Sequence, residues 1–169
     1  MYHIDDTLVY GNHGVCRVTD IAERDFCGKE SLYYVLEPVF DRGCTFFVDV
    51  HNSVAAARLR PVLAPEEAER LIAAMPRVEE QWDDNPRQRR ALYSRIIAGG
   101  DRLELIGLIK ALYDYEQQQI SASKKLSSGD EQSLRLAEKL IDQEIAYAPR
   151  LEPAQVASYI ESRLALTAQ

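Results

Sequence analysis

The chain has 169 residues, of which 46% are hydrophobic and 28% charged, a balance typical of a soluble globular protein with enough apolar residues for a core. It shows neither a secretory signal nor an apolar run long enough to span a membrane, so we expect neither secretion nor membrane insertion. Its net charge of −7 argues against indiscriminate nucleic-acid binding, because phosphate repels an acidic protein unless its basic residues are grouped.

Three cysteines, Cys16, Cys27 and Cys44, lie far apart along the chain. Their odd number indicates reduced thiols in a cytoplasm rather than disulfides. A zinc site that adds His13 or His51 would lack any CxxC pair and the usual ligand spacing. We therefore expect no metal and no cofactor.

Catalytic residue types occur in the first half, but no known arrangement links them. His13, Cys16, Asp20 and His51 belong to no triad signature, Gly-rich phosphate loop or metal-ligand spacing. His13 is more simply a turn residue. We therefore expect that the chain is not an enzyme.

Residues 1–63 have the pattern of short strands. Aromatic and β-branched residues predict strands over 7–10, 14–21, 31–39 and 44–50, with 57–63 as a short fifth strand. A Gly/Asn cluster between the first two is typical of a hairpin turn, and Pro61 favours an edge position for the last. Such short strands without a long helix predict a small, strongly bent antiparallel sheet or barrel.

From Pro65 onward the hydrophobic period is helical. Helices are predicted over 65–75, 86–100, 101–119, 128–148 and 153–164. They begin with favoured residues, which are Pro65, Asn85 with Pro86, Asp101 with Glu104, and Ser128 with Glu131. The apolar stripes are Leu105, Leu108, Ile109 and Leu112; Leu134, Ala137, Leu140, Ile141 and Ile145; and Val156, Ile160 and Leu164. We predict an α+β chain, with an antiparallel β-module over 1–63 and an all-α helical bundle over 64–169.

The only tryptophan, Trp82, lies among four acids in a segment without clear periodicity. Its indole can be a hydrophobic plug between helices. Alternatively, it is an apolar wedge that enters an unstacked base step, while nearby arginines contact phosphates without reading sequence. Arginines are concentrated only here, since no acid lies between Asn85 and Ile97 and four arginines do (Arg87, Arg89, Arg90 and Arg95). The alternative for that run is a solvated helix face.

The ordered set of segments resembles the CarD/CdnL family of bacterial transcription regulators. The resemblance rests on LVYGNHGVCRVTDI, YYVLEP and LRPVLAPEEAERLI in the first half, and on Trp82 followed by NPRQRRALY, LIGLIKALYDYEQ and KLSSGDEQSLRLAEKLIDQEIA in the second. It implies a Tudor-like, polymerase-interacting module followed by a helical DNA-binding domain. The same module is similar to one in transcription-repair coupling factors, but this chain has no phosphate loop for their ATP-driven motor.

The resemblance implies where DNA would bind. Trp82 is expected against the upstream edge of the melted promoter bubble. On a helix, residues 87 and 90 are neighbours while residue 89 points elsewhere, so Arg87 and Arg90 are the first candidates for phosphate contacts and Arg89 follows them. Lys124 and Lys125 are weaker candidates, with a solvated loop as the alternative.

The resemblance also implies a contact with RNA polymerase, through its beta subunit. Arg24 matches the first of two commonly basic positions, but Phe47 stands at the second and cannot reproduce a bidentate carboxylate contact. Tyr33 and Tyr34 alternate faces of one strand, so one face belongs to the core. The other face can bind a partner, for example by strand addition, or the strand is simply internal.

These expectations describe a cytoplasmic, nucleoid-associated regulator. It would bind RNA polymerase through residues 1–63, contact promoter DNA without sequence specificity through residues 64–169, and bias the closed-to-open equilibrium. The alternative is a polymerase- or protein-binding adaptor of the same fold without DNA binding, which the net charge and Phe47 favour. The sequence leaves open the target promoters, the direction of regulation and the oligomeric state, a strand-swapped dimer included.

Overall fold

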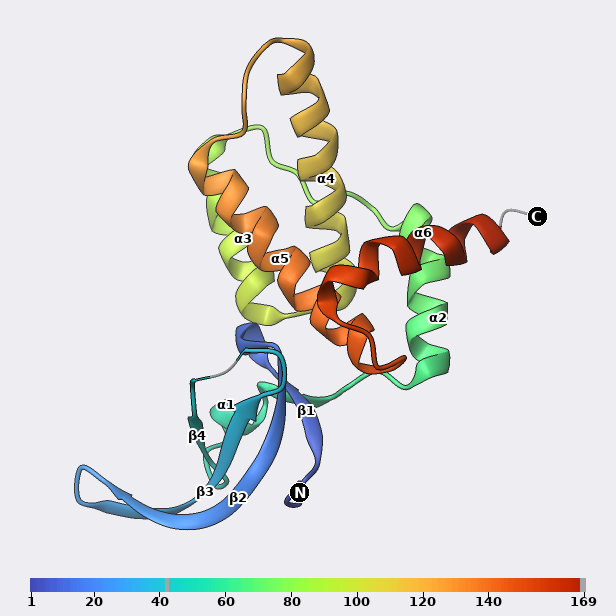
Figure 1. Cartoon of the computed structure of the whole chain (residues 1–169). Coiled ribbons are helices and arrows are strands. Elements are labelled where there is room, and N and C mark those ends of the chain that lie inside the picture. Colours follow the sequence, from blue (N-terminus) through green and yellow to red (C-terminus); the bar gives the residue numbers. More distant parts are fainter. Residues whose placement is uncertain (42, 168–169) are drawn as a thin grey trace.

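A computed structural model describes residues 1–41 and 43–167 of the chain. It shows the predicted α+β fold, in which an antiparallel five-stranded sheet is followed by a helical region (Figure 1). Within the described ranges, every helix is too short or too polar to cross a membrane.

The sheet has the order β4-β3-β2-β1-β5, with all neighbours antiparallel. Its strands are β1 (Thr7–Tyr10), β2 (Val15–Phe26), β3 (Lys29–Pro38), β4 (Phe46–Asp49) and β5 (Leu59–Pro61). Pro61 lies on an edge strand, as expected. Figure 1 shows a strongly curved sheet from which the end of the β2–β3 hairpin projects away from the helices.

The β2–β3 hairpin is longer than the sequence pattern predicts. Pairing continues outward to Phe26 opposite Lys29, beyond the expected ends at residues 21 and 31. The turn residues Cys27 and Gly28 have φ of 58° and 79°, as the favoured two-residue hairpin turns require. Charged residues dominate this extension, so it carries no apolar alternation and its pairing is invisible in the hydrophobic pattern.

One face of the sheet carries the core of the β-module. This core is closed in part by the short helix α1 (Ser53–Ala56), which the sequence analysis did not predict; the Asn52 side chain caps it. Tyr34 is 4% exposed here. The other buried members are Leu8, Cys16, Val18, Leu36, Val48 and Leu59.

The helical region contains α2 (Pro65–Ala74), α3 (Pro86–Gly99), α4 (Arg102–Ser121), α5 (Ser128–Tyr147) and α6 (Val156–Thr167). Asn85 and Asp101 cap α3 and α4, as predicted. The predicted cap of α5 is wrong by one residue, because Ser127 rather than Ser128 accepts the Asp130 N–H, at 3.1 Å. The predicted apolar stripes meet in one core.

The sheet and the helices meet at a polar junction. Glu144 of α5 is 2% exposed and accepts hydrogen bonds from Arg60 of β5 and Arg102 of α4, each at 2.5 Å. Beside it, Gln143 Oε1 accepts the Val15 N–H at 3.4 Å. Gly14 has φ of 81°, a backbone conformation that residues with a Cβ rarely adopt, and a Cβ there would also displace the Gln143 side chain. These contacts fix how the β-module is attached to α5.

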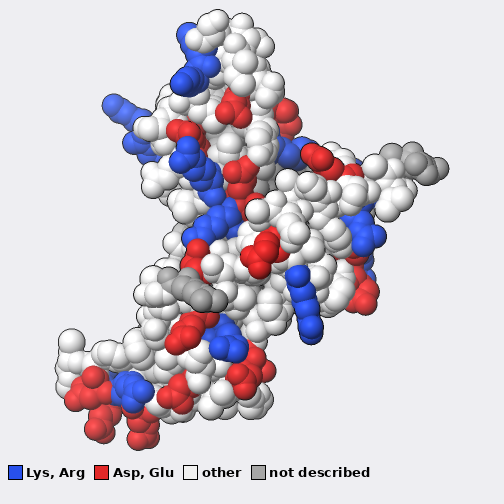
Figure 2. Space-filling model, in the orientation of Figure 1, with Lys and Arg blue, Asp and Glu red and all other residues white. Residues whose placement is uncertain are grey.

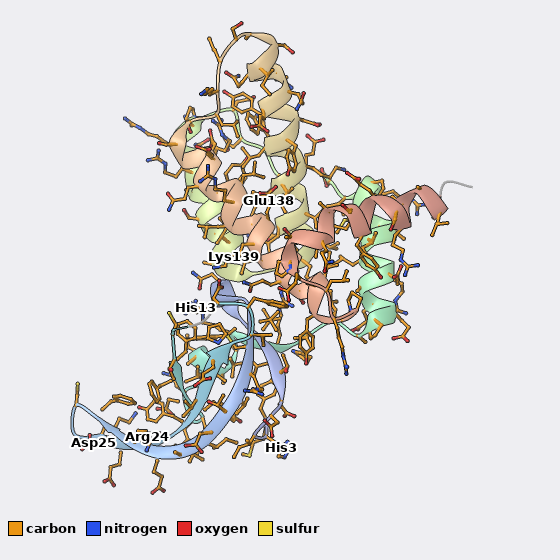
Figure 3. The ribbon with its side chains drawn as sticks, in the orientation of Figure 1. His3, His13, Arg24, Asp25, Glu138 and Lys139 are labelled. Carbon is orange, nitrogen blue, oxygen red and sulfur yellow. The ribbon has the colours of Figure 1, made fainter. Side chains whose placement is uncertain are left out.

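A second part of the junction is visible in Figure 3, where Lys139 and His13 lie close to the point at which the helices meet the sheet. Lys139 forms an ion pair of 2.8 Å with Asp41. The Gln143 side chain donates to the same carboxylate at 3.0 Å. Charge and hydrogen bonding thus hold the loop after β3 against α5.

Candidate nucleic-acid and polymerase interfaces

Trp82 is partly exposed, as predicted, at the edge of the helical core. Its ring centroid lies 4.7 Å from that of Tyr115 in α4, and its Nε1 donates to Asp84 at 2.9 Å. The indole therefore has one packed face and a satisfied N–H. The ring borders the core and still reaches solvent, so the plug and the wedge both stay predictions.

The segment that carries Trp82 is anchored across α4. The Gln81 N–H donates to the Gly107 carbonyl at 3.1 Å, and Lys110 Nζ donates to the Val78 carbonyl at 2.6 Å. A Cβ at position 107 would lie 2.3 Å from the Glu79 carbonyl oxygen. Glycine within a helix commonly marks such a close backbone approach. An irregular stretch of chain is thereby held in a defined place.

Arg89 lies beneath Trp82 rather than on the surface. It is 6% exposed, and its guanidinium carbon lies 4.4 Å from the Trp82 ring centroid. Its Nη2 forms an ion pair of 3.2 Å with Asp130, and its Nη1 donates to the Asp83 carbonyl at 3.0 Å. The Arg89 cation attracts the Trp82 ring face, and its ion pair with Asp130 holds Arg89 in place, so together they favour one position of the ring.

This burial does not suit the phosphate contact expected for Arg89. Burial opposes the charged guanidinium, but the hydrogen bond and the charge of Asp130 raise the pKa of Arg89 above its ordinary value. The Asp130 carboxylate also accepts from Ser127, the N-cap of α5. Arg89 is thus a positioning residue that joins the start of α5 to the Trp82 segment.

The remaining predicted cations are exposed. None of Arg87, Arg90, Lys124 and Lys125 has a side-chain hydrogen bond or ion pair with the residues that the structure describes. The structure brings Arg90 and Lys125 together on a hollow of about 370 Å³ beside Tyr115, whereas Arg87 and Lys124 lie outside its lining. Figure 2 shows Lys and Arg side chains gathered along the upper left of the helical region.

The sheet offers a different surface on the face opposite its core. Tyr33 lies on this outer face and contacts Phe26, with ring centroids 5.0 Å apart and an interplanar angle of 84°. Phe26 also contacts Phe47 of the edge strand β4, at 5.3 Å. Phe26 and Phe47 are 44% and 43% exposed. We call Phe26, Tyr33 and Phe47 the aromatic cluster.

The strand alternation separates the two predicted tyrosines. Tyr34 is buried in the core, so its expected role as a polymerase contact is wrong for the folded module, whereas Tyr33 faces outward. Arg24 is exposed on the side of the aromatic cluster, since it pairs with Ser31 two positions from Tyr33. The sequence analysis missed Phe26, although an aromatic residue set among charges just before a Gly turn is a recognisable signal.

Comparison with known protein families identifies the first part of the chain. Residues 2–63 match the family model of the CarD-like/TRCF RID domain, the RNA polymerase-interacting domain of CarD/CdnL-type proteins. The match contains the whole aromatic cluster and Arg24. Trp82 and the hollow lined by Arg90 and Lys125 lie beyond residue 63.

Proposed function

We propose that this chain, whose residues 2–63 form an RNA polymerase-interacting domain of the CarD type, is a transcription regulator that modulates the open promoter complex. The matched family supports a transcription-related polymerase binder with a non-enzymatic role. The observation that carries the DNA part is Trp82. Its ring is held from below by the buried Arg89–Asp130 pair and leaves an edge in solvent, close to unpaired cations.

We assign phosphate contacts to the cations and the contact with an opened base step to the Trp82 ring. Arg90 and Lys125, with Arg87 and Lys124 nearby, would contact phosphates of promoter DNA whether or not the bases are paired, without reading sequence. The Trp82 ring would find a partner only where a base step has opened. A contact made in the open complex alone and worth about 1.4 kcal/mol shifts the closed-to-open equilibrium tenfold.

The polymerase contact would bring these groups to the promoter. We expect this contact on the beta subunit, as the family resemblance implies, and the regulator would then act in the cytoplasm, at the nucleoid, through polymerase. Because the junction around Glu144 fixes the β-module to α5, binding of the module also sets the direction in which Trp82 approaches DNA.

An adaptor that binds polymerase without DNA is the second candidate. The net charge of −7 and the burial of Arg89 favour it, because both reduce the cationic surface. The two candidates differ in one observable. A DNA-contacting regulator shifts forked promoter DNA in a salt-dependent manner, whereas the adaptor leaves its mobility unchanged.

The test is open-complex lifetime on a promoter, measured with RNA polymerase from the source organism and with the full chain. We expect the wild type to change the lifetime and Trp82→Ala to abolish the change. Leu166→Ala, at an exposed apolar position in α6, is the matched control. Melting temperatures of all three proteins separate a lost contact from a lost fold. A lifetime that the wild type leaves unaltered would contradict the proposed regulation.

A further inference from the structure

We infer that the β2–β3 hairpin binds polymerase as a two-faced blade, whose partner is a cleft with one apolar wall and one wall of Lys and Arg side chains. This inference rests on the proposed function and names the chemistry of its polymerase contact. It differs from the contact implied by two basic residues, which would meet carboxylates. The hairpin projects from the molecule, so a partner can reach both of its faces (Figure 1).

The first face is the aromatic cluster. Phe26 and Phe47 have more than two fifths of their surface in water, even though they pack against each other. The three rings meet edge to face, at 84° and 61°, and so form a preorganised apolar surface. Tyr and Phe are enriched at protein interfaces, where rigid rings bury large areas at a small entropy cost.

The second face is acidic. Strand register places Asp25 directly opposite Glu30, and Glu23 two positions from Asp25 on the same side. All three side chains are exposed. Like charges directly opposite on paired strands destabilise a hairpin. Figure 2 shows acidic side chains crowded at this end of the sheet, and Figure 3 labels Asp25 there beside Arg24.

The two cations in the outer part of the hairpin, Arg24 and Lys29, do not neutralise that face. Arg24 Nη2 lies 3.8 Å from Asp20, and Lys29 Nζ lies 3.9 Å from Asp49. Both pairs are on the side of the aromatic cluster, so each cation is already matched by an acid. Asp25 accepts the Gly28 N–H of its own turn at 2.7 Å. Glu23 and Glu30 form no side-chain hydrogen bond or ion pair with the described residues. The negative charge of this face is thus available to a cationic partner, because complementary potentials favour association.

The experiment is the affinity of the full chain for purified RNA polymerase from the source organism. We expect Phe26→Ala and Phe47→Ala each to weaken binding at least tenfold. Glu23→Lys, on the same face but without a hydrogen bond among the described residues, should weaken binding and reduce its dependence on salt concentration. Arg24→Ala should change affinity less than twofold. Val54→Ala, at a position 76% exposed in α1, is the control and should bind as the wild type does.

Phe47→Arg separates this blade from a basic contact. It restores a cation at the second commonly basic position, so an acidic polymerase site would bind it more tightly than the wild type. The apolar wall should bind it at least tenfold more weakly. Tight binding of Phe47→Arg, or unchanged binding of both alanine variants, overturns the inference while the wild type still binds polymerase. Absent binding by the wild type overturns the proposed function with it.

Discussion

The Arg89 guanidinium carbon lies 4.4 Å from the centre of the Trp82 ring while the same side chain forms an ion pair with Asp130 at 3.2 Å. One buried cation thus contacts both the Trp82 ring and Asp130 at the start of α5. The indole position and the start of α5 cannot shift independently. Asp130, the ion-pair partner of Arg89, is hydrogen-bonded through both its carboxylate and its N–H to Ser127, the N-cap of α5.

Arg89→Ala should therefore damage the fold as well as the site. It leaves Asp130 as a buried, unpaired carboxylate, and breaking a buried pair costs about 3–5 kcal/mol of unfolding free energy. Denaturant unfolding measures this loss. Its control is Arg87→Ala, at an exposed position on the same helix, which should change stability by less than about 0.5 kcal/mol. Equal stability of the two variants would refute the positioning role of Arg89.

Arg90→Ala should have the opposite profile. The side chain is exposed and unpaired among the described residues, so thermal stability should remain that of the wild type. Binding to forked promoter DNA should weaken similarly for all sequences, with a salt slope reduced by about one. Arg70→Ala, at an exposed position in α2, serves as control. If Arg70→Ala weakens DNA binding as much as Arg90→Ala does, the phosphate contacts lie elsewhere.

Glu144→Gln should loosen the junction. The variant keeps the shape of the side chain but leaves Arg60 and Arg102 without their shared negative charge, so we expect a loss of about 3–5 kcal/mol. Proteolysis should also become faster around residues 61–65. Glu131→Gln, an exposed position on the same helix, should change stability by less than about 0.5 kcal/mol. A Glu144→Gln protein as stable as the wild type would show that the junction does not depend on this charge.

Asp142 predicts a pH effect on stability. Burial, with a smaller contribution from the charge of Glu138, raises the pKa of Asp142 from 3.8 to about 6. A raised pKa means that folding disfavours the ionised form. The cost is absent below about pH 4, grows as pH rises to 6, and stays constant above it.

Asp142→Asn should accordingly stabilise the protein at pH 7, by about 1–2 kcal/mol since the side chain is only partly buried, and leave it unchanged near pH 4. Melting temperatures at the two pH values measure the difference. Asp114→Asn, an exposed position in α4, should have no such pH-dependent effect. An equal gain in stability at both pH values would show that the gain does not come from the ionisation of Asp142.

Local signals predicted much of the fold. Asn85 and Asp101 cap the helices expected of them, because a cap depends on residues two or three positions away. The N-cap of α5 was predicted at Ser128 but is Ser127. Local signals could not distinguish the two, since adjacent serines have the same capping chemistry. The helical stripes were confirmed because burial follows the 3.6-residue period.

The candidate site was harder to predict, because its decisive contacts join distant residues. Arg89 is separated from Asp130 by 41 positions, and nothing in the run of arginines distinguishes the buried one from the exposed ones. The sequence around Phe26 marks an aromatic residue before a turn, but only the pairing of β2 with β3 shows that Phe26 lies on the same face as Tyr33. The hydrophobic pattern of the sequence therefore does not predict this pairing.

The contact between Arg60 and Glu144 spans 84 positions in sequence, which has a consequence for incomplete chains. During synthesis, all five strands emerge before α5, so the polymerase-interacting domain precedes the helix that orients it. A product terminated before residue 144 would retain the hairpin but lose the fixed attachment of everything after it. We expect such a fragment, if it survives proteolysis, to bind polymerase and so to compete with the intact chain.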